Sequence, residues 1–97
     1  MRGGNLVKVR LRAIFSGRVQ GVFFRANAKG FADEHGIAGW IRNTEDGRVE
    51  ALFEGEEEAV MSVVSRCQRE QPYARVSSVE TTKEEYQGEM TEFKIEY

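Results

Sequence analysis

The most constraining feature of this 97-residue sequence is the alternation of apolar and other side chains over residues 7–15. The apolar set is Val7, Val9, Leu11, Ala13 and Phe15, and the residues between them are Lys8, Arg10, Arg12 and Ile14. A period of two over this length predicts a β-strand, because successive side chains of a strand point to opposite faces. The chain therefore begins its fold with a half-buried strand.

Two later segments have the periodicity of amphipathic helices. The first apolar stripe consists of Phe24, Ala28, Phe31 and Ala32, and the second of Val60, Val63, Val64 and Cys67. These residues recur every three or four positions, which places them on one helix face. Gly36 is suited to end the first helix, and the acidic residues 56–58 suit the positive end of the second helix dipole.

The remaining segments predict further strands and complete the fold. The predicted strands cover residues 37–42, 48–54, 75–82 and 92–97. Asp46 and Gly47 lie in a hairpin loop between the strands at 37–42 and 48–54. A polar connector divides the last strand of the fold into two pieces, residues 75–82 and 92–97. The order β-α-β-β-α-β predicts an α+β fold, the ferredoxin-like sandwich, with an antiparallel sheet and two helices on one face. The length fits one domain over residues 1–97.

Charge and cysteine content narrow the possible functions. The formal net charge is −2, so no general positive field attracts nucleic acid or an acidic membrane, and any anion site has to be local. Cys67 is the only cysteine, which rules out a disulfide within the chain. The sequence has neither a secretory signal nor an apolar run of membrane-spanning length. These features predict a cytoplasmic domain.

Metal binding and covalent catalysis find little support among the side chains. His35 and Cys67 are the only soft metal ligands and lie on different predicted helices, whereas a zinc or iron site needs three or four such residues. We interpret His35 as a residue at a helix C-terminus and Cys67 as a buried core residue. Ser16 and Ser77 lie outside any G-x-S-x-G motif. We therefore expect no metal site and no covalent intermediate.

RNA binding has to be considered because RNA-recognition domains share this fold class. The segment K-G-F-A, residues 29–32, matches the start of a signature of those domains. The match then fails, since D-E-H follows and the segment lies on a predicted helix rather than a central strand. Base stacking requires aromatic rings on the open face of the sheet, whereas Phe31 belongs to a helix core stripe. RNA binding is disfavoured.

The stretch S-G-R-V-Q-G-V-F-F-R, residues 16–25, joins the first strand to the first helix. Glycines there let backbone N–H groups converge, and the helix contributes the positive end of its dipole. Arg25, in the first helical turn, can add a forked hydrogen bond to the same anion. Alternatively, Gly17 and Gly21 only form the turn and Arg25 is a surface arginine. The pattern leaves both possibilities open.

A second segment, G-W-I-R-N-T-E-D-G-R-V, residues 39–49, places Asn43 at the end of the second predicted strand. Asparagine at a hairpin often caps the turn, so a purely structural role for Asn43 also remains open. Contact between Asn43 and Arg25 is an inference from the proposed fold, because the second strand need not lie beside the end of the first.

Together the two segments resemble the acylphosphatase family. The family patterns G-x-V-Q-G-V-x-F-R and G-W-V-x-N-x-x-D-G-x-V are both matched at the family's spacing, and Ile41 in place of valine is a conservative departure. The resemblance covers residues 7–97, which makes residues 1–6 an N-terminal extension. It implies the ferredoxin-like fold and the hydrolysis of acyl phosphates to a carboxylate and inorganic phosphate.

By this resemblance Arg25 binds the phosphate and Asn43 orients the attacking water. The backbone amides of the implied phosphate cradle are those of Gln20, Gly21, Val22, Phe23 and Phe24. Members of the family are usually cytoplasmic monomers without a metal or organic cofactor, and we expect the same here. The alternative is a non-catalytic anion-binding or regulatory domain of the same fold, which would have no use for a water-orienting amide.

Overall fold

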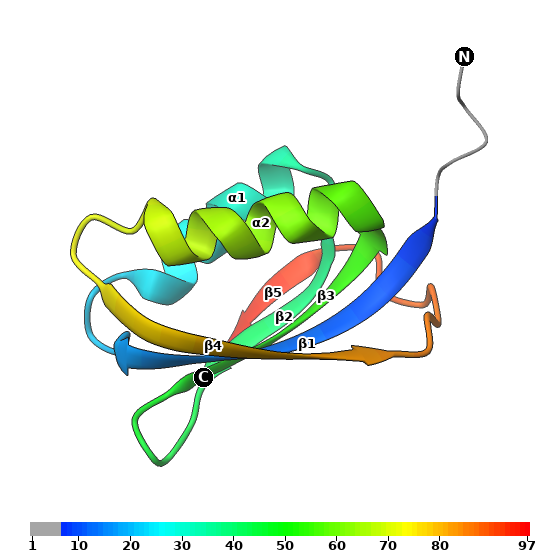
Figure 1. The fold of residues 1–97 in the computed structure, drawn as a ribbon. Helices are drawn as coiled ribbons and strands as arrows, with labels where there is room; N and C mark the ends of the chain where they lie inside the picture. Colours follow the sequence, from blue (N-terminus) through cyan, green and yellow to red (C-terminus); the bar gives the residue numbers. More distant parts are fainter. Residues whose placement is uncertain (1–6) are drawn as a thin grey trace.

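The described part of the computed structural model, residues 7–97, forms five strands and two helices (Figure 1). In chain order they are β1 (Lys8–Arg18), α1 (Phe24–Glu34), β2 (Ala38–Asn43), β3 (Val49–Glu56), α2 (Glu57–Arg69), β4 (Arg75–Glu84) and β5 (Phe93–Glu96). Every segment predicted as helix or strand adopts that structure, with small differences in its bounds. The expected N-terminal extension, residues 1–6, lies outside the described residues. Neither described helix has the length and apolar character to cross a membrane.

The sheet has the strand order β4-β1-β3-β2-β5, and both helices cover the same face (Figure 1). This arrangement confirms the ferredoxin-like sandwich. The pairs β4–β1, β1–β3 and β3–β2 are antiparallel, but β5 runs parallel to β2. The C-terminal strand expected in two pieces is thus two separate strands at opposite edges. The connector after β4 carries the chain from one edge to the other, so β5 enters the sheet in the direction of β2.

Glu54 on β3 fixes this connector, residues 85–92, to the sheet. Its carboxylate accepts hydrogen bonds from Arg10 Nη1 at 3.0 Å and from the backbone N–H groups of Gln87 at 2.9 Å and Gly88 at 3.1 Å. Burial by itself raises the pKa of Glu54, but the hydrogen bonds outweigh it, and the pKa lies below its ordinary value. The residue is only 3% exposed, so the charge is buried and satisfied.

The core lies between the helices and the covered face of the sheet. The rings of Phe15 and Phe24 pack with centroids 5.1 Å apart, which joins β1 to the start of α1, and Phe53 stacks on Phe93 at 5.5 Å. Cys67 is completely buried on α2, and burial raises the pKa of its thiol to about 12. His35 is the residue at the C-terminal end of α1. Both sequence interpretations, a core cysteine and a helix-terminal histidine, are confirmed.

Gly17 belongs to β1 rather than to the turn that follows. The register between β1 and β4 shifts between Ser16 and Gly17, and the strand continues to Arg18. Gly17 has φ +119°, and a Cβ there would lie 2.3 Å from the carbonyl oxygen of Arg75. This bulge therefore requires glycine for close approach of two strands. Only Gly21 is left to shape the strand-to-helix turn.

Candidate active site

The turn between β1 and α1, residues 19–23, has a backbone shaped for an anion. Gly21 has φ +73°, and Phe23 has φ 62° and ψ 22°, so two residues of this short turn are left-handed. Left-handed residues alternating with right-handed ones turn successive N–H groups towards one side, forming a concave nest. Within residues 7–97, the N–H groups of Gln20, Gly21, Val22, Phe23 and Phe24 donate no hydrogen bond. They are free donors beside the start of a helix.

Buried side chains hold this turn in place. Val19 is 1% exposed, and Val22 and Phe24 are also buried in the core cluster. Phe23 is different, because its ring is exposed and its left-handed backbone conformation is strained for a residue with a Cβ, at a cost of about 1–3 kcal/mol. Such strain persists only where the surrounding structure dictates it, and it is typical of functional turns.

The Gln20 side chain joins this turn to the β2–β3 hairpin. Its Nε2 donates to the carbonyl oxygens of Thr44 at 2.9 Å and Arg48 at 2.7 Å. Thr44 closes the hairpin itself, since its Oγ1 accepts from the Arg48 N–H at 3.0 Å. Sequence analysis proposed only the Gln20 backbone amide for the site and missed this side-chain role. The two bonds fix the turn before Arg25 relative to the strand end that carries Asn43.

Arg25 extends from the first turn of α1 towards the end of β5. Its Nη1 donates to the Glu96 carbonyl oxygen at 3.0 Å, and its guanidinium carbon lies 4.8 Å from the centroid of the Tyr97 ring. No carboxylate of residues 7–97 forms a salt bridge with Arg25. The arginine is thus held in position by a neutral acceptor and an aromatic ring while its charge remains available to an anion.

Asn43 is the last residue of β2, opposite Val49 of β3. Its Oδ1 is buried and has no hydrogen-bond partner within the described chain. The hairpin is capped by Thr44 and not by the Asn43 side chain, which weighs against the structural alternative for this residue. Buried polar atoms in folded proteins are almost always paired, so the Asn43 Oδ1 at this pocket is a candidate to accept a hydrogen bond from a bound molecule.

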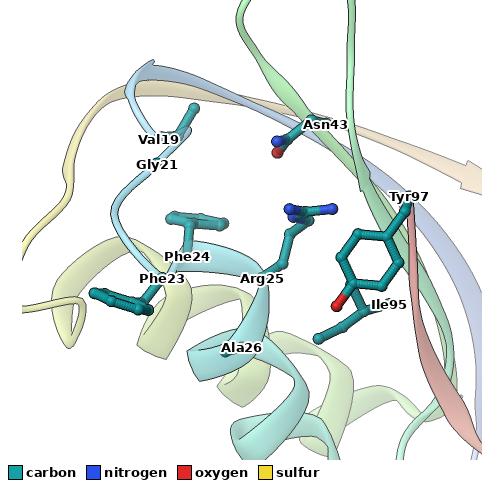
Figure 2. Close-up of a pocket in the computed structure, with 9 residues that line it drawn as sticks. All are labelled: Val19, Gly21, Phe23, Phe24, Arg25, Ala26, Asn43, Ile95 and Tyr97. Carbon is teal, nitrogen blue, oxygen red and sulfur yellow. The ribbon is translucent and has the colours of Figure 1, made fainter.

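The structure brings Arg25 and Asn43 to one open pocket of about 320 Å³ (Figure 2). Its lining consists of Val19, Gly21, Phe23, Phe24, Arg25, Ala26, Asn43, Ile95 and Tyr97. Figure 2 shows the Arg25 guanidinium and the Asn43 amide pointing towards each other from α1 and β2. Both side chains therefore line the same pocket, one from α1 and the other from β2. Ile95 of β5 and Tyr97, the residue after that strand, also line the pocket, and sequence analysis assigned neither of them to the site.

The loop between α2 and β4 contacts both the β1–α1 turn and the first residues of α1. Gln71, one of the few buried polar residues, donates from Nε2 to the Phe24 carbonyl oxygen at 3.1 Å and accepts from Asn27 Nδ2 at 3.0 Å. Tyr73 of the same loop packs edge-on against Phe23, with ring centroids 6.3 Å apart. These contacts join residues more than forty positions apart, so no local pattern could have predicted them.

Other polar groups near this end of the sheet have structural roles. A hydrogen bond from Arg48, and to a smaller extent one from Thr44, lowers the pKa of Asp46 to about 2, which keeps the hairpin carboxylate charged and paired.

Within residues 7–97, no three His, Cys, Asp or Glu side chains gather in a way that could hold a metal ion. The polar groups that line the pocket include the Arg25 guanidinium and the Asn43 amide.

The fold and site define the class: a ferredoxin-like domain whose pocket is lined by a left-handed turn, an arginine and an asparagine with an unpaired Oδ1. The family model described as Acylphosphatase matches residues 11–95. The acylphosphatase of Roseiflexus sp. (strain RS-1) is 51% identical over 86 residues, 89% of this chain and 92% of the relative. This chain therefore belongs to the acylphosphatase family.

Solved structures agree with this assignment. The acylphosphatase of Bacillus subtilis superimposes with a TM-score of 0.87 at 38% identity, covering 92% of this chain and 99% of the other. The acylphosphatase of Coxiella burnetii superimposes with a TM-score of 0.86 at 28% identity, covering 99% of this chain and 100% of the other. The similarity therefore spans the whole domain in both directions.

Proposed function

We propose that this chain hydrolyses acyl phosphates to a carboxylate and inorganic phosphate at the pocket between α1 and β2. The observation that carries the proposal is that one pocket is lined by Arg25, by Asn43 with its unpaired Oδ1, and by the turn residues Gly21, Phe23 and Phe24. Family membership supports the same activity.

Arg25 and the turn amides hold the phosphoryl group in this proposal. The N–H groups of Gln20, Gly21, Val22, Phe23 and Phe24 form hydrogen bonds to its oxygens, and the Arg25 guanidinium adds a charge-assisted pair. Because the turn is already fixed by buried side chains and by Gln20, these donors need little reorganisation when charge develops. Preorganised donors of this kind are the main source of rate enhancement in phosphoryl transfer.

Asn43 orients the attacking water. Its Oδ1 accepts a hydrogen bond from a water molecule, whose oxygen then attacks phosphorus in line with the bond to the acyl oxygen. That bond breaks, and the acyl group leaves as a carboxylate. A carboxylate is a good leaving group, so no strong general acid is required. The proton of the water passes to a phosphate oxygen, since no carboxylate, histidine or lysine of residues 7–97 lines the pocket.

The same proposal covers cofactors, partners and location. The scheme requires no metal and no organic cofactor, because positioning and charge neutralisation come from the chain itself. We place the protein in the cytoplasm as a monomer that binds neither nucleic acid nor membrane. On the open sheet face the cations Arg10, Arg12 and Arg42 are each paired with a glutamate, which weighs against RNA binding by these three arginines.

A non-catalytic anion-binding domain remains the competing function, and one experiment separates the two. Hydrolysis of acetyl phosphate is measured for the wild type and Asn43→Ala with a chelator present, together with competitive inhibition by inorganic phosphate. We expect the wild type to turn over and Asn43→Ala to lose about 10²–10³ in kcat while phosphate inhibition changes little. A wild type that binds phosphate without turnover identifies a binding domain. Activity that returns only with added metal contradicts the cofactor-free scheme.

A further inference from the structure

The phosphate-binding and water-orienting groups of the proposed site lie on two segments that no strand pairing joins directly. β3 lies between β1 and β2 in the sheet, and its pairing with both strands ends at Val49, opposite Phe15 on one side and Asn43 on the other. Beyond that point, residues 16–18 of β1 pair with β4 alone. The β1–α1 turn and the β2–β3 hairpin therefore have no ladder in common.

Each of these two segments has internal support. The hairpin is closed by Thr44, whose N–H donates to the Arg48 carbonyl oxygen at 2.9 Å and whose Oγ1 accepts from the Arg48 N–H at 3.0 Å. The turn is held by buried side chains, among them Val19, and by the bond from Gln71 to the Phe24 carbonyl oxygen at 3.1 Å. Each segment therefore keeps its shape through contacts of its own.

The Gln20 side chain is the link between the two segments. It is half-buried, and its Nε2 donates to the carbonyl oxygens of Thr44 and Arg48, one on each side of the hairpin loop. Among the hydrogen bonds within residues 7–97, these are the only two that join residues 19–25 to residues 43–49. A primary amide has two N–H donors, and both are used here. Gln20 thus fixes the position of the hairpin relative to the turn.

In-line attack depends on that relative position. In the proposed function the turn amides and Arg25 hold the phosphoryl group, whereas Asn43 holds the attacking water. The distance and angle of attack are therefore set by how the hairpin sits beside the turn, and Thr44, which Gln20 binds, directly follows Asn43. A displacement of about 1 Å in such an arrangement can lower a rate about a hundredfold.

From this geometry we infer that the Gln20 side chain is a positioning residue, which sets the attacking water against the phosphoryl group by holding the hairpin to the turn. The inference rests on the proposed function and deepens it, because it names the link between the two halves of the site. The side chain acts through Asn43 and touches neither the water nor the phosphate. Its contribution belongs to turnover and not to phosphate binding.

The test measures hydrolysis of acetyl phosphate and competitive inhibition by inorganic phosphate for the wild type, Gln20→Met, Asn43→Ala and the double variant. Gln20→Met keeps the backbone N–H and about the same side-chain length, but its side chain has no N–H donor. Gln68→Met is the matched control, because Gln68 is an exposed glutamine on α2. Thermal unfolding shows whether each variant is folded.

We expect kcat to fall about tenfold in Gln20→Met, while the inhibition constant of phosphate changes by less than about twofold, because the turn keeps its own supports. In the Asn43→Ala background the same change should lower kcat by less than about twofold, since no water is held there for the hairpin to misplace. Gln68→Met should match the wild type in both quantities.

A merely structural role gives a different pattern, in which phosphate binding weakens and the losses of the two single variants multiply in the double variant. That pattern, or an unchanged kcat in folded Gln20→Met, refutes the positioning role and leaves the proposed function intact. Gln20→Glu is a second, nearly isosteric variant whose carboxylate cannot donate to the two carbonyl oxygens. Wild-type kcat in Gln20→Glu at neutral pH also refutes the role. A wild type that does not hydrolyse acetyl phosphate refutes the proposed function itself.

Discussion

The two ends of the β2–β3 pair differ in whether a buried polar side-chain atom has a hydrogen-bond partner. Glu54 lies at one end, opposite Ala38, and Asn43 lies at the other, opposite Val49. The Glu54 carboxylate accepts hydrogen bonds from one arginine and two backbone N–H groups, whereas Asn43 Oδ1 accepts none within residues 7–97. We refer to these as the Glu54 end and the Asn43 end of the sheet.

The difference separates stability from function within one pair of strands. A buried polar group that is fully paired stabilises the fold and fixes its neighbours, and the Glu54 end accordingly anchors the connector to β5. A buried polar group without a partner costs free energy, so the fold gains nothing from it. The Asn43 end keeps that cost together with the strained Phe23 backbone, as expected of a site organised for a substrate.

The largest effect is expected at the Asn43 end from Arg25→Lys. An ammonium group cannot reproduce the planar, two-pronged hydrogen bonding of the guanidinium, so kcat/KM for acetyl phosphate should fall about 10³-fold or more. The thermal midpoint should shift little, because no salt bridge within the described chain depends on Arg25. Steady-state kinetics and thermal unfolding on the same samples measure both. A lysine variant that keeps most of the activity contradicts the assigned role of Arg25.

At the Glu54 end, Glu54→Ala should show the reverse behaviour. The change removes the acceptor of two backbone N–H groups of the connector, while Arg10 retains Glu84 at 3.3 Å. We expect the free energy of unfolding to fall by about 2–3 kcal/mol in urea denaturation, with kcat near the wild-type value. Glu85→Ala is the control, since this exposed glutamate of the same connector makes no side-chain hydrogen bond among residues 7–97. If Glu54→Ala loses as much activity as Arg25→Lys, the Glu54 end is not purely structural and the proposed difference between the two ends is wrong.

Sequence patterns predicted the elements of this fold because each depends on nearby residues. The alternation that ends at Phe15 and the stripe that includes Ala28 describe one strand and one helix without reference to the rest of the chain. The parallel pairing of β5 with β2 could not be predicted in this way, because it depends on where residues 85–92 cross the sheet. That crossing is fixed by Glu54, whose sequence context resembles that of any exposed strand glutamate.

The candidate site also combines residues that sequence motifs predicted with contacts between residues far apart in the sequence. Arg25 and Asn43 were predicted because both lie in motifs that resemble a known family, and the structure places them in one pocket. Their catalytic roles remain predictions. The side-chain bonds of Gln20 and Gln71 were missed, because each reaches a partner twenty or more positions away and glutamine has no distinctive pattern. Sequence thus indicated the groups that face the pocket and missed those that hold them.

Acid should affect the two ends differently. The folded-state pKa of Glu54 lies below its ordinary value, so its stabilising contribution is complete above that ordinary value and is lost as pH falls through the lowered one. Glu54→Gln should therefore flatten part of the acid-side decline in stability. The rest remains because the pKa values of other paired carboxylates, among them Glu84, Glu50 and Asp46, are also lowered. The rate should be nearly flat from mildly acidic to neutral pH in both proteins. A bell-shaped rate profile reveals an acid–base pair that the scheme lacks.

The smallest effect is expected from Gln71→Leu, which tests whether a buried group at the Asn43 end behaves like Glu54. Gln71 is paired as Glu54 is, but its partners, the Phe24 carbonyl and Asn27, belong to the turn and helix that carry Arg25. Loss of these bonds should reduce stability by about 1 kcal/mol and raise KM for acetyl phosphate about two- to threefold, because the turn is less well fixed. Gln68→Leu, an exposed glutamine on α2, should change neither quantity. If Gln71→Leu lowers stability and leaves KM unchanged, Gln71 has a purely structural role like that of Glu54. Proximity to the Asn43 end would then not be enough to make a buried polar group part of the site.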